Sequence, residues 1–584
     1  MDFLIKLKPG LLSEKSLVDI QSSQEPVLKI TNTRAAFKVL HYVLGDWECY
    51  LIGDLVFPQE IETDPALQAN YIQQYFKQNK LYQLKGFHYL IVLNHESNSI
   101  IIFSCFLNIL PVYYNVSGEV ITVSGSLSEV YKEMENKPDP NERYIVEKAL
   151  FNYSFLNSTP FSNIFLMPSC HYITISKAGL SINKYYSPGD LIVEKPIPWK
   201  KNLKALSDVY SKELITYVPG QLFALTLTGG FDGRTVLSSA LSIKAKFDTF
   251  SYGSSGAPDV LLPESISKTI GFPYMPFYLD DNYAKNDFWN DAISFLMRSE
   301  GAGNISRGHY ICTARELSKK HNYLLTGNFG SELIRSMKDP GVMASEVLFA
   351  LFDADDKQVF EKFVNSRKQL DFIDPVLREK HLSALIDEAW NYKQSLPQNY
   401  SANKKFYMYM FGEVFRKYFG AEIVAQSEFL INRSPFIDFT IFESTLKTSI
   451  AGVYQDFKEK RPLKRFHGQI LYAFILKKLY PPLLDLMLDK GYKPKNFLSI
   501  AGRLSILLGY LKRNYLNKNK NYNPSYSEKF YDFNYDKLES IVEESKYLNK
   551  ELLKTVLQSG EWKQQQQEFV NALSMELYYQ KYLN

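Results

Sequence analysis

The chain has 584 residues and carries 67 Lys and Arg against 63 Asp and Glu, a net charge of +4. Hydrophobic residues make up 45% of it and charged residues 22%, which excludes a disordered chain. A charge of +4 over this length also lacks the basic footprint of a nucleic-acid-binding protein, so we expect no nucleic-acid partner.

Cysteine usage and hydropathy narrow the class of protein further. Cys49, Cys105, Cys170 and Cys312 lie far apart, which excludes a zinc ribbon and argues against a disulfide scaffold. No run reaches the roughly 18–20 apolar residues of a membrane helix. The N-terminus, MDFLIKLKPG, lacks the apolar core and cleavage site of a secretory signal. We therefore expect a cytoplasmic protein without a membrane span.

The first part of the chain, residues 1–186, reads as strands. Runs rich in β-branched and aromatic residues follow one another at short spacing: FHYLIVLN (87–94), IIIFSCFL (100–107), PVYYNV (111–116), VITVSGS (120–126) and HYITIS (171–176). Helical periodicity is confined to pieces such as ALQANYIQQYFKQ and NERYIVEKALFNY. The pattern predicts an antiparallel, layered β-rich domain with a few helices.

A proline- and glycine-rich segment, KYYSPGDLIVEKPIPWK, is expected to link this domain to residues 187–584. Beyond it, strands at LFALTLT (222–228), AKFDTFSYG (245–253), PYMPFYLD (273–280) and HNYLLTGN (321–328) alternate with helical patterns, one of them near 258–270. This alternation predicts an α/β domain with a parallel sheet. Beyond about residue 336 nearly everything is helical, with interruptions near Pro375, Pro435, Pro462, Pro481 and Pro494.

The segment LTLTGGFDGRT (225–235) carries the strongest chemical signal. An apolar strand runs into Gly229 and Gly230, whose backbone amides can converge beside the start of the next helix and bind an anion. Asp232 suits a Mg²⁺ ion that arrives with phosphates, and Arg234 could add a bidentate phosphate contact. The simpler alternatives are a plain strand-to-helix turn and, for Asp232, an N-terminal cap of a helix that starts near Thr235.

Two further loops of small residues follow later strands of the same predicted sheet. They are YGSSGAPD (252–259) and LTGNFGSE (325–332). Because the carboxyl ends of parallel strands meet at one edge, the three loops are expected to converge on one crevice, where open sheets bind ligands. The sequence therefore predicts a nucleotide site there.

These segments resemble the asparagine synthetase family of ATP pyrophosphatases, whose relatives include lactam and lasso-peptide cyclases. TGGFDGR is similar to the SGGxDS pyrophosphate loop, FSYGSSGAPD to the adenine loop, TGNFGSEL to SGxGxDEL, RSPFID to the PFLD segment, and LYPPLLDLMLDKGYKP to the stretch that holds a reactive-centre lysine. LKGFHYLIVLN, LPVYY and PFSNIFLMPSCHYITI resemble the family's glutaminase-like domain. The resemblance implies a degenerate Ntn glutaminase-like domain (1–186) and an ATP-pyrophosphatase domain with a helical C-terminal region (187–584).

The resemblance also implies roles for particular residues, with ATP and Mg²⁺ as cofactors. Lys490 would stabilise the developing charge, with Lys493 as its nearest rival and a surface lysine in a turn as the plain alternative. Asn328 and Glu332 would line the place where the acyl group reacts, and Asp232 would hold the metal. The residues expected to bind ATP and pyrophosphate are Thr228, Gly229, Gly230, Asp232, Gly233, Arg234, Tyr252, Gly253, Ser254 and Gly327.

Several positions depart from the family pattern. The family's glutaminase needs a cysteine as its first mature residue, whereas this sequence starts Met1-Asp2. The family's Asp-Arg pair before PLYY aligns with Cys105 and Phe106, so the first domain is predicted to be an inactive structural or docking relic. In the second domain Gly233 replaces a hydroxyl residue, Asn328 an acid that often acts at the reaction centre, and Ser331 the second metal carboxylate.

The expected function is an ATP-dependent carbon–nitrogen ligase. It would adenylate a carboxylate, release pyrophosphate and let an amine or ammonia form an amide. The alternatives are asparagine synthase proper, which converts aspartate to asparagine, and a nucleotide-binding scaffold without turnover. The implied partners are a small-molecule or peptide carboxylate and an amine donor, and a homodimer is compatible with the sequence. The sequence does not identify the acid or the nucleophile.

Overall fold

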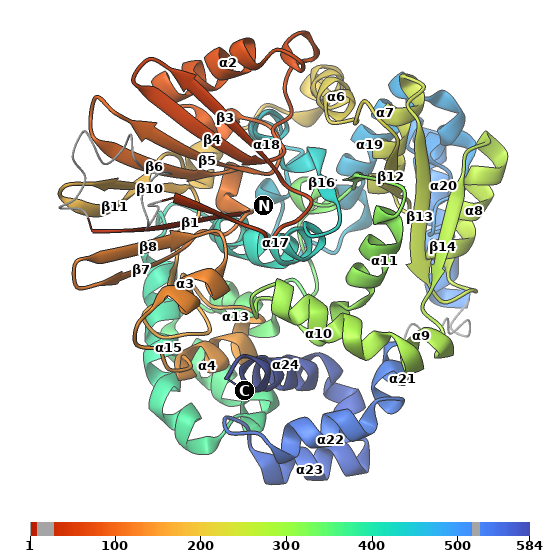
Figure 1. Ribbon diagram of the computed structural model, residues 1–584. Coiled ribbons are helices and arrows are strands. Elements are labelled where there is room, and N and C mark those ends of the chain that lie inside the picture. The colour runs from red at the N-terminus through yellow and green to blue at the C-terminus, as the bar shows by residue number, and fades with distance from the viewer. Residues whose placement is uncertain (1, 9–27, 517–525, 584) are drawn as a thin grey trace.

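A computed structural model describes residues 2–8, 28–516 and 526–583, which form a mixed α/β fold with antiparallel sheets, a parallel sheet and many helices (Figure 1). Up to Lys184 the strands are antiparallel and lie in two sheets, ordered β2-β1-β8-β7-β9 and β11-β10-β6-β5-β4-β3. The elements are β1 (Asp2–Leu7), β2 (Leu28–Thr31), β3 (Lys38–Leu44), β4 (Trp47–Gly53), α2 (Pro65–Lys77), β5 (His88–Asn94), β6 (Ser99–Ser104), β7 (Tyr113–Ser117), β8 (Val120–Ser124), α3 (Leu127–Glu133), α4 (Glu142–Phe151), β9 (Phe165–Leu166), β10 (His171–Ser176) and β11 (Gly179–Lys184).

Side-chain alternation on β5 explains the layers of this first part. Tyr89 and Ile91 face the cluster that contains Phe3 of the other sheet, and the rings of Phe3 and Tyr89 lie 5.1 Å apart. Leu90 belongs to a separate cluster on the opposite face, which α2 covers with Ile72. Because successive residues of a strand point to opposite faces, a strand that is apolar throughout is covered on both sides. The predicted layered, antiparallel arrangement is confirmed.

The second sheet is parallel and ordered β14-β13-β12-β15-β16. Four of its strands fall in the predicted segments. The fifth, β16, was not predicted, because it has only three residues, two of them polar, within a stretch that reads as helical. β12 lies between β13 and β15. After β12 the chain adds β13 and β14 on one side of it and later adds β15 and β16 on the other side. Such a reversal of strand order leaves a crevice at the carboxyl end of the central strand. The strands are β12 (Phe223–Thr226), β13 (Phe247–Gly253), β14 (Tyr274–Tyr278), β15 (Tyr323–Leu325) and β16 (Ile431–Arg433).

Prolines mark where the helices of the second part begin. Pro375 and Pro462 are the first residues of α15 and α19, and Pro188 opens a short helix inside the predicted linker, capped by the Ser187 hydroxyl. Proline suits this position because its fixed backbone angle fits a helix and its missing amide would have no partner there. The helices are α5 (Pro188–Leu191), α6 (Trp199–Thr216), α7 (Phe231–Ser242), α8 (Pro258–Ile270), α9 (Asp281–Asn286), α10 (Phe288–Arg298), α11 (His309–Ser318), α12 (Gly330–Ile334), α13 (Glu346–Asp353), α14 (Lys357–Asn365), α15 (Pro375–Ser395), α16 (Ala402–Tyr409), α17 (Phe415–Gln426), α18 (Phe439–Leu446), α19 (Pro462–Leu479), α20 (Ile500–Leu516), α21 (Tyr526–Asp532), α22 (Tyr535–Glu543), α23 (Lys550–Ser559) and α24 (Gln566–Leu583).

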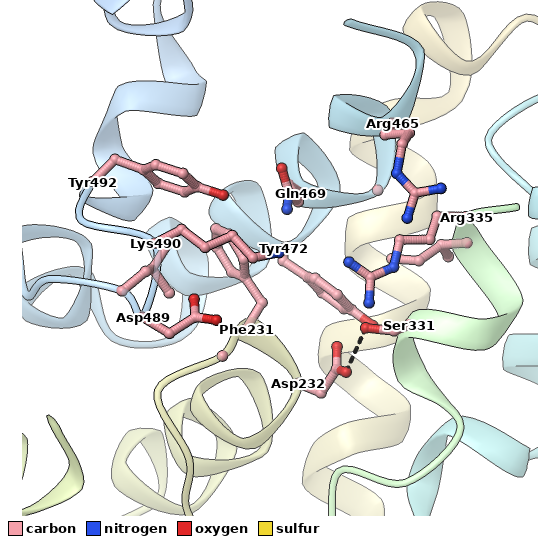
Figure 2. Close-up of a pocket in the computed structure, with 14 residues that line it drawn as sticks. Phe231, Asp232, Ser331, Arg335, Arg465, Gln469, Tyr472, Asp489, Lys490 and Tyr492 are labelled. Atoms are coloured by element: carbon pink, nitrogen blue, oxygen red, sulfur yellow. Dashed lines mark hydrogen bonds between the residues drawn. The ribbon is translucent and has the colours of Figure 1, made fainter. Parts of the chain in front are cut away.

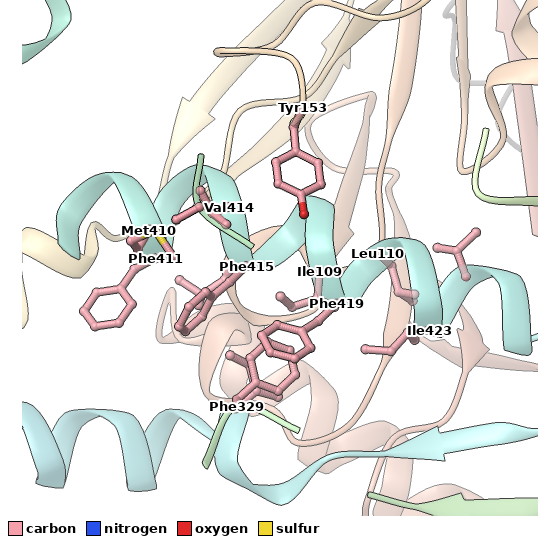
Figure 3. Packing of buried hydrophobic residues seen from close by; sticks show 14 of the residues in the cluster. Ile109, Leu110, Tyr153, Phe329, Met410, Phe411, Val414, Phe415, Phe419 and Ile423 are labelled. Carbon is pink, nitrogen blue, oxygen red and sulfur yellow. The ribbon is translucent and has the colours of Figure 1, made fainter. Parts of the chain in front are cut away.

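Apolar side chains join the first part to the helices of the second. Ile109 and Leu110, from the loop after β6, belong to one buried cluster with Phe415, Phe419 and Ile423 of α17 (Figure 3). This cluster also contains many other apolar residues of both parts. Apolar packing thus continues across residue 186, and the division into two domains there stays a prediction.

A buried ion pair and the last helix reinforce this junction. Arg433 of β16 donates to both carboxylate oxygens of Asp54, with Nε at 2.8 Å and Nη2 at 3.0 Å. The helix α24 lies beside α4 in Figure 1. Its Asn571 amide donates to Asn152 Oδ1 at 3.1 Å, and its Tyr579 hydroxyl donates to the Pro160 carbonyl at 2.8 Å. Residues of the first part thus form hydrogen bonds with residues more than 400 positions later in the chain.

Crossing a membrane requires a helix that is both long and apolar. Across residues 2–8, 28–516 and 526–583, no helix combines the length and the apolar content that crossing a bilayer requires.

Candidate functional site

The glycine turn after β12 carries Asp232 into the first turn of a helix. α7 begins at Phe231, and Gly230 occupies the N-terminal cap position with an extended backbone. Asp232 is therefore inside the helix, and the alternative in which it caps a helix starting near Thr235 is wrong. A carboxylate in the first helical turn is favoured by the helix dipole.

The backbone amides of this turn already form hydrogen bonds with neighbouring side chains. The Gly229 amide donates to Asp259 Oδ1 at 3.2 Å, and the Gly230 amide makes a longer contact of 3.4 Å with Thr228 Oγ1. A side chain at Gly229 would come within 3.0 Å of the Cβ atom of Asp489, so glycine is required there by close approach. A phosphate would therefore compete with Asp259 for the Gly229 amide.

The loops after β12 and β15 meet, as their positions in the sheet predict. A Cβ atom on Gly327 would lie 2.9 Å from the backbone of Asp232 and of Gly233. One on Gly330 would lie 3.0 Å from Asp232 Oδ1. The Ser331 hydroxyl donates to Asp232 Oδ2 at 2.6 Å. Ser331, at the family's second carboxylate position, thus fixes the Asp232 side chain.

Two carboxylates lie close together at this point. Burial raises the pKa of Asp232, although the hydrogen bond from Ser331 opposes the shift. Burial and then the neighbouring Asp232 carboxylate raise the pKa of Glu332 to about 7. Asp232 Oδ1 and the Tyr472 hydroxyl are both buried, and neither makes a hydrogen bond of ordinary geometry among the described residues. The two groups nevertheless interact, because the Tyr472 hydroxyl lowers the pKa of Asp232.

The donor set fits a magnesium ion. A carboxylate oxygen without a hydrogen bond of ordinary geometry, beside a second carboxylate, is the arrangement that a hard cation stabilises, because Mg²⁺ binds through one or two carboxylates together with water and phosphate oxygens. Among the described residues no group of three or more His, Cys, Asp or Glu side chains gathers for a metal. Asp232, with Glu332 next to it, would accordingly need phosphate oxygens to complete the coordination.

Lys490 lies at the same cavity as Asp232, which has a volume of about 150 Å³ (Figure 2). The loop that carries Lys490 is tied to the glycine turn, because the Asp489 amide donates to the Gly229 carbonyl at 3.2 Å. Partial desolvation lowers the pKa of the Lys490 ammonium. The cavity is lined by Gly230, Phe231, Asp232, Ser331, Ile334, Arg335, Arg465, Gly468, Gln469, Tyr472, Leu488, Asp489, Lys490 and Tyr492.

Several polar residues of this cavity were not predicted from the sequence, among them Arg335, Arg465 and Gln469. Arg335 follows α12, and Arg465 and Gln469 come from α19. They belong to none of the resembling motifs, and only the fold brings α19 against the end of α12. Only the position of Arg335 could have indicated a site residue, because Arg335 follows the TGNFGSEL segment (326–333) by two residues. Lys493, the rival of Lys490, is not among the lining residues.

Arg234 does not make the expected phosphate contact. Its side chain is fully buried, and its guanidinium donates to the carbonyls of Leu486 (2.9 Å), Met487 and, at 3.4 Å, Gly229. Residues two apart on a helix point in nearly opposite directions, so Asp232 and Arg234 cannot both face the cavity. Arg234 instead fastens the loop that carries Lys490 to the glycine turn.

The other predicted residues lie around the cavity rather than on its lining. Tyr252 is at the end of β13, where its ring lies 4.5 Å from that of His309, and the Gly253 carbonyl accepts from the Leu279 amide at 3.0 Å. Ser254 follows β13, and its carbonyl accepts from the Ala257 amide at 2.9 Å. The adenine role expected for Tyr252, Gly253 and Ser254 stays a prediction.

Asn328 faces α17 instead of Asp232. Its amide donates to Glu422 Oε1 at 3.2 Å, and Glu422 in turn pairs with Arg307 at 3.0 Å. The following residue, Phe329, has a φ of 71° and packs its ring 4.0 Å from Phe419. A phenylalanine with a left-handed backbone is strained, so this packing holds the turn that brings the Ser331 hydroxyl to Asp232.

The first strand, β1, begins with a buried ion pair. Met1 lies outside the described residues, but Asp2 is fully buried, pairs with Arg34 and accepts from the Thr33 hydroxyl at 3.0 Å. Phe106, where the family has arginine, packs its ring 5.4 Å from that of Phe439. Burial raises the pKa of the Cys105 thiol, which disfavours the thiolate that a nucleophile needs.

We expect the purified protein to form no glutamate from glutamine, with or without ATP. The reason is chemical: burial keeps the Cys105 thiol protonated, and Phe106 packs against Phe439 where the resembled family has an arginine. Glutamate is measured by a coupled dehydrogenase assay. Glutamate formed at a rate that Cys105→Ala does not change would show that another nucleophile is present.

A second cavity, of about 370 Å³, opens where the first part meets α10 and α17. Arg34, Ser126 and Glu300 are buried at it, and the Ser126 hydroxyl donates to Glu300 Oε1 at 2.7 Å. Burial raises the pKa of Glu300 to about 7. The Glu300 carboxyl is therefore protonated over part of the pH range in which an ordinary glutamate is ionised.

Glu300→Gln is expected to stabilise the protein above pH 7 and to leave its stability unchanged near pH 4.5. A carboxyl whose pKa rises from 4.5 to about 7 on folding favours the folded state fully below pH 4.5 and loses that advantage as the pH rises through 7. Glutamine keeps the bond from Ser126 without the charge, and the gain at pH 8 is at most about 3 kcal/mol. Denaturant midpoints at pH 5 and pH 8 measure it; equal shifts at both would contradict the assignment.

Comparison with known proteins leaves the family open. No family model matches the chain, and no curated protein matches it. Among solved structures, one that matches is glutamine phosphoribosylpyrophosphate amidotransferase from B. subtilis complexed with ADP and GMP, with 9% identity and a TM-score of 0.18. The match covers 52% of this chain and 66% of that chain, just under two thirds of its length. A TM-score this low carries no argument about fold or activity, so the expected family stays a prediction.

Proposed function

We propose that the protein is an ATP-dependent carbon–nitrogen ligase that activates a carboxylate with release of pyrophosphate and then joins it to an amine or to ammonia. The observation that supports this most is that Asp232, whose buried Oδ1 makes no hydrogen bond of ordinary geometry among the described residues, lines one cavity with Lys490 at the carboxyl end of the central strand β12. A phosphate group and its Mg²⁺ ion would together satisfy both groups, the ion at Asp232 and the phosphate at Lys490.

The first step would use groups on both walls of the cavity. A carboxylate oxygen of the acid attacks the α-phosphorus of ATP, the bond from that phosphorus to the bridging oxygen breaks, and pyrophosphate leaves. Gly230, in the N-terminal turn of α7, and the Lys490 ammonium would stabilise the charge that develops on the phosphates. A Mg²⁺ ion held by Asp232 would supply further neutralisation of phosphate charge.

The second step would need a proton acceptor. The amine nitrogen attacks the activated acyl carbon, the carbon–oxygen bond to AMP breaks, and the nitrogen loses one proton. Glu332 is the candidate acceptor, because burial and Asp232 raise its pKa to about 7 and match it to neutral conditions. Asn328 cannot accept the proton, and its bond to Glu422 leaves it a positioning role.

Amide formation is expected to speed up as the pH rises through about 7, with a slope set by one ionisation. Glu332 accepts a proton only when it is ionised, so the rate falls below its raised pKa. Glu332→Gln should lower the rate and remove this limb of the profile. Initial rates between pH 5.5 and 8.5 measure it. An unchanged limb in Glu332→Gln would assign the ionisation to another group.

The same site is compatible with two alternative functions. Asparagine synthase proper is the first, with aspartate as the acid. The second is a nucleotide-binding scaffold without turnover. It is favoured by one observation: the Gly229 amide and the Arg234 guanidinium are already bound within the protein, which holds the Lys490 loop closed over the glycine turn.

The test combines nucleotide binding with turnover. Calorimetry with Mg²⁺ and α,β-methylene-ATP, which cannot release pyrophosphate, measures affinity, and pyrophosphate release from ATP is then followed with a panel of carboxylic acids and amines. Binding together with acid-dependent release supports the ligase, and release with aspartate and ammonia alone identifies asparagine synthase. Binding without release for any pair supports the scaffold. Absence of binding contradicts all three functions.

A further inference from the structure

One face of α20 exposes a row of large apolar side chains. Ile500, Leu504 and Leu508 are 72%, 55% and 66% exposed. They follow one another at a spacing of four residues, which puts them on the same side of the helix. Ile506, by contrast, is buried on the other side. No other helix of the described residues presents three exposed large apolar side chains, so the row on α20 differs from the ordinary scatter of a protein surface.

Contacts within the protein fix α20 to the wall of the candidate site. The Ser499 hydroxyl accepts from the Gly502 amide at 3.0 Å and so caps the first turn of the helix. A Cβ atom on Gly502 would clash with the Asn496 carbonyl, so glycine lets α20 approach the preceding turn closely. From that turn, the Phe497 ring lies 5.5 Å from the ring of Phe231, which lines the cavity. The exposed row is therefore presented by a helix that is already formed and held in place.

The sequence of α20 and of the residues that follow it is basic. Residues 499–527 contain five Lys and Arg residues and no Asp or Glu, whereas the whole chain has a net charge of only +4. The same stretch contains four tyrosines, a residue type that is enriched where a membrane meets water. An exposed apolar helix face in a basic sequence without acids is the pattern of helices that lie on anionic bilayers. The five basic residues are Arg503, Lys512, Arg513, Lys518 and Lys520.

Two other occupants fit this face less well than a bilayer does. In a symmetric dimer the same surface of both copies would meet, so Arg503 and the basic sequence of one copy would approach those of the other and repel them. A nucleic acid would attract the positive charge but would leave the three apolar side chains in contact with water. A bilayer satisfies both features, because its acyl chains take up the apolar row and its anionic headgroups attract Lys and Arg.

We propose that α20 binds the surface of an anionic lipid bilayer, with Ile500, Leu504 and Leu508 inserted at the boundary between headgroups and acyl chains. The basic residues of the helix would be attracted to the anionic headgroups. The association is peripheral, because one apolar face of a helix enters the interface without crossing the bilayer. It is independent of the proposed function, since neither ATP nor the acid takes part in it. Because Phe497 joins α20 to the cavity wall, the bound protein would hold its cavity near the lipid surface.

The experiment measures binding of the full-length protein to two kinds of vesicle by flotation. One kind is phosphatidylcholine alone, and the other is an equal mixture of phosphatidylcholine and phosphatidylglycerol. The leucine variant is Leu504→Ser/Leu508→Ser, and the charge variant is Lys512→Gln/Arg513→Gln. The matched control is Leu67→Ser/Val376→Ser, which replaces two exposed apolar side chains of α2 and α15. Thermal midpoints confirm that each variant is folded, and light scattering gives its oligomeric state.

The wild type is expected to bind the mixed vesicles roughly tenfold or more tightly than those of phosphatidylcholine alone, and added salt should weaken the binding. The leucine variant should bind the mixed vesicles about tenfold or more weakly than the wild type, because its apolar area at the interface is smaller. The charge variant should lose about tenfold on the mixed vesicles, and the control should bind as the wild type does.

Absence of binding to the mixed vesicles, or binding that the leucine substitutions leave unchanged, overturns the proposal. So does equal binding to both kinds of vesicle, which would remove the role of the basic residues. A wild-type dimer that becomes a monomer in the leucine variant would assign the face to a second copy of the chain and overturn it as well. Because no nucleotide enters the experiment, none of these results bears on the proposed function.

Discussion

Asp232→Asn is expected to lower ATP-dependent pyrophosphate release by about a hundredfold or more, which is the size of effect seen when one charge-stabilising group is removed from an active site. Asparagine has nearly the same shape and can still accept the hydrogen bond from Ser331, so the fold should be kept. Burial of the Asp232 carboxylate costs desolvation energy, and asparagine removes the charge that causes this cost. The thermal midpoint of the variant should therefore equal or exceed that of the wild type. Release is measured with saturating ATP over a range of Mg²⁺ concentrations.

The matched control for this substitution is Asp489→Asn. Asp489 lines the same cavity, but its link to the glycine turn is through its backbone amide rather than its carboxylate. The control should therefore retain more activity than Asp232→Asn, although the loss of the Asp489 charge lowers the pKa of Lys490 further. A rate in Asp232→Asn close to that of the wild type would show that the metal and the phosphates are held elsewhere. Equal losses in both variants would assign the effect to the charge of the cavity as a whole.

Arg433→Met is expected to lower the free energy of unfolding by about 3–5 kcal/mol, because it leaves the Asp54 carboxylate buried without its partner. Asp54 is 6% exposed and Arg433 7% exposed, and two hydrogen bonds join them across the junction between the two parts. Unfolding by urea, followed by circular dichroism, measures the loss. Circular dichroism also shows whether the variant folds before the titration begins.

The double variant Asp54→Leu/Arg433→Met separates the cost of an unpaired charge from the worth of the pair. Replacing both partners removes the buried charge, so most of the stability should return. A double variant as unstable as Arg433→Met would mean that the arginine acts through its other contacts, among them the Tyr217 carbonyl at 3.4 Å and the ring of Tyr323.

Much of the parallel sheet could be predicted because its strands are apolar runs bounded by turn residues. The helix expected near 258–270 is α8 (Pro258–Ile270), and the strand expected at 222–228 contains β12. The short strand β16 escaped, since Asn432 and Arg433 carry no strand signal and are fixed only by pairing with β15. Tertiary pairing decides such short elements, and no local pattern records it.

Less of the cavity was accessible from the sequence. Gly230, Asp232 and Lys490 were found because they lie in recognisable motifs, whereas Arg335 and Arg465 are brought together from segments 130 positions apart. Arg234 was misassigned because a motif gives the residue type but not the direction in which a helix points it. The identity of the family could not be settled by motifs either, and neither could the roles of the substituted positions.

The packing of α24 against α4 and the residues that follow it constrains the order in which this chain folds in the cell. When the ribosome has made α4, the partners of Asn152 and Pro160 are still more than 400 residues from being synthesised. Until α24 is synthesised, α4 and the residues after it lack these partners and expose apolar surface, which favours aggregation and chaperone binding. Translation of this protein should therefore produce its tertiary structure late and over nearly the whole length at once, rather than one part after another.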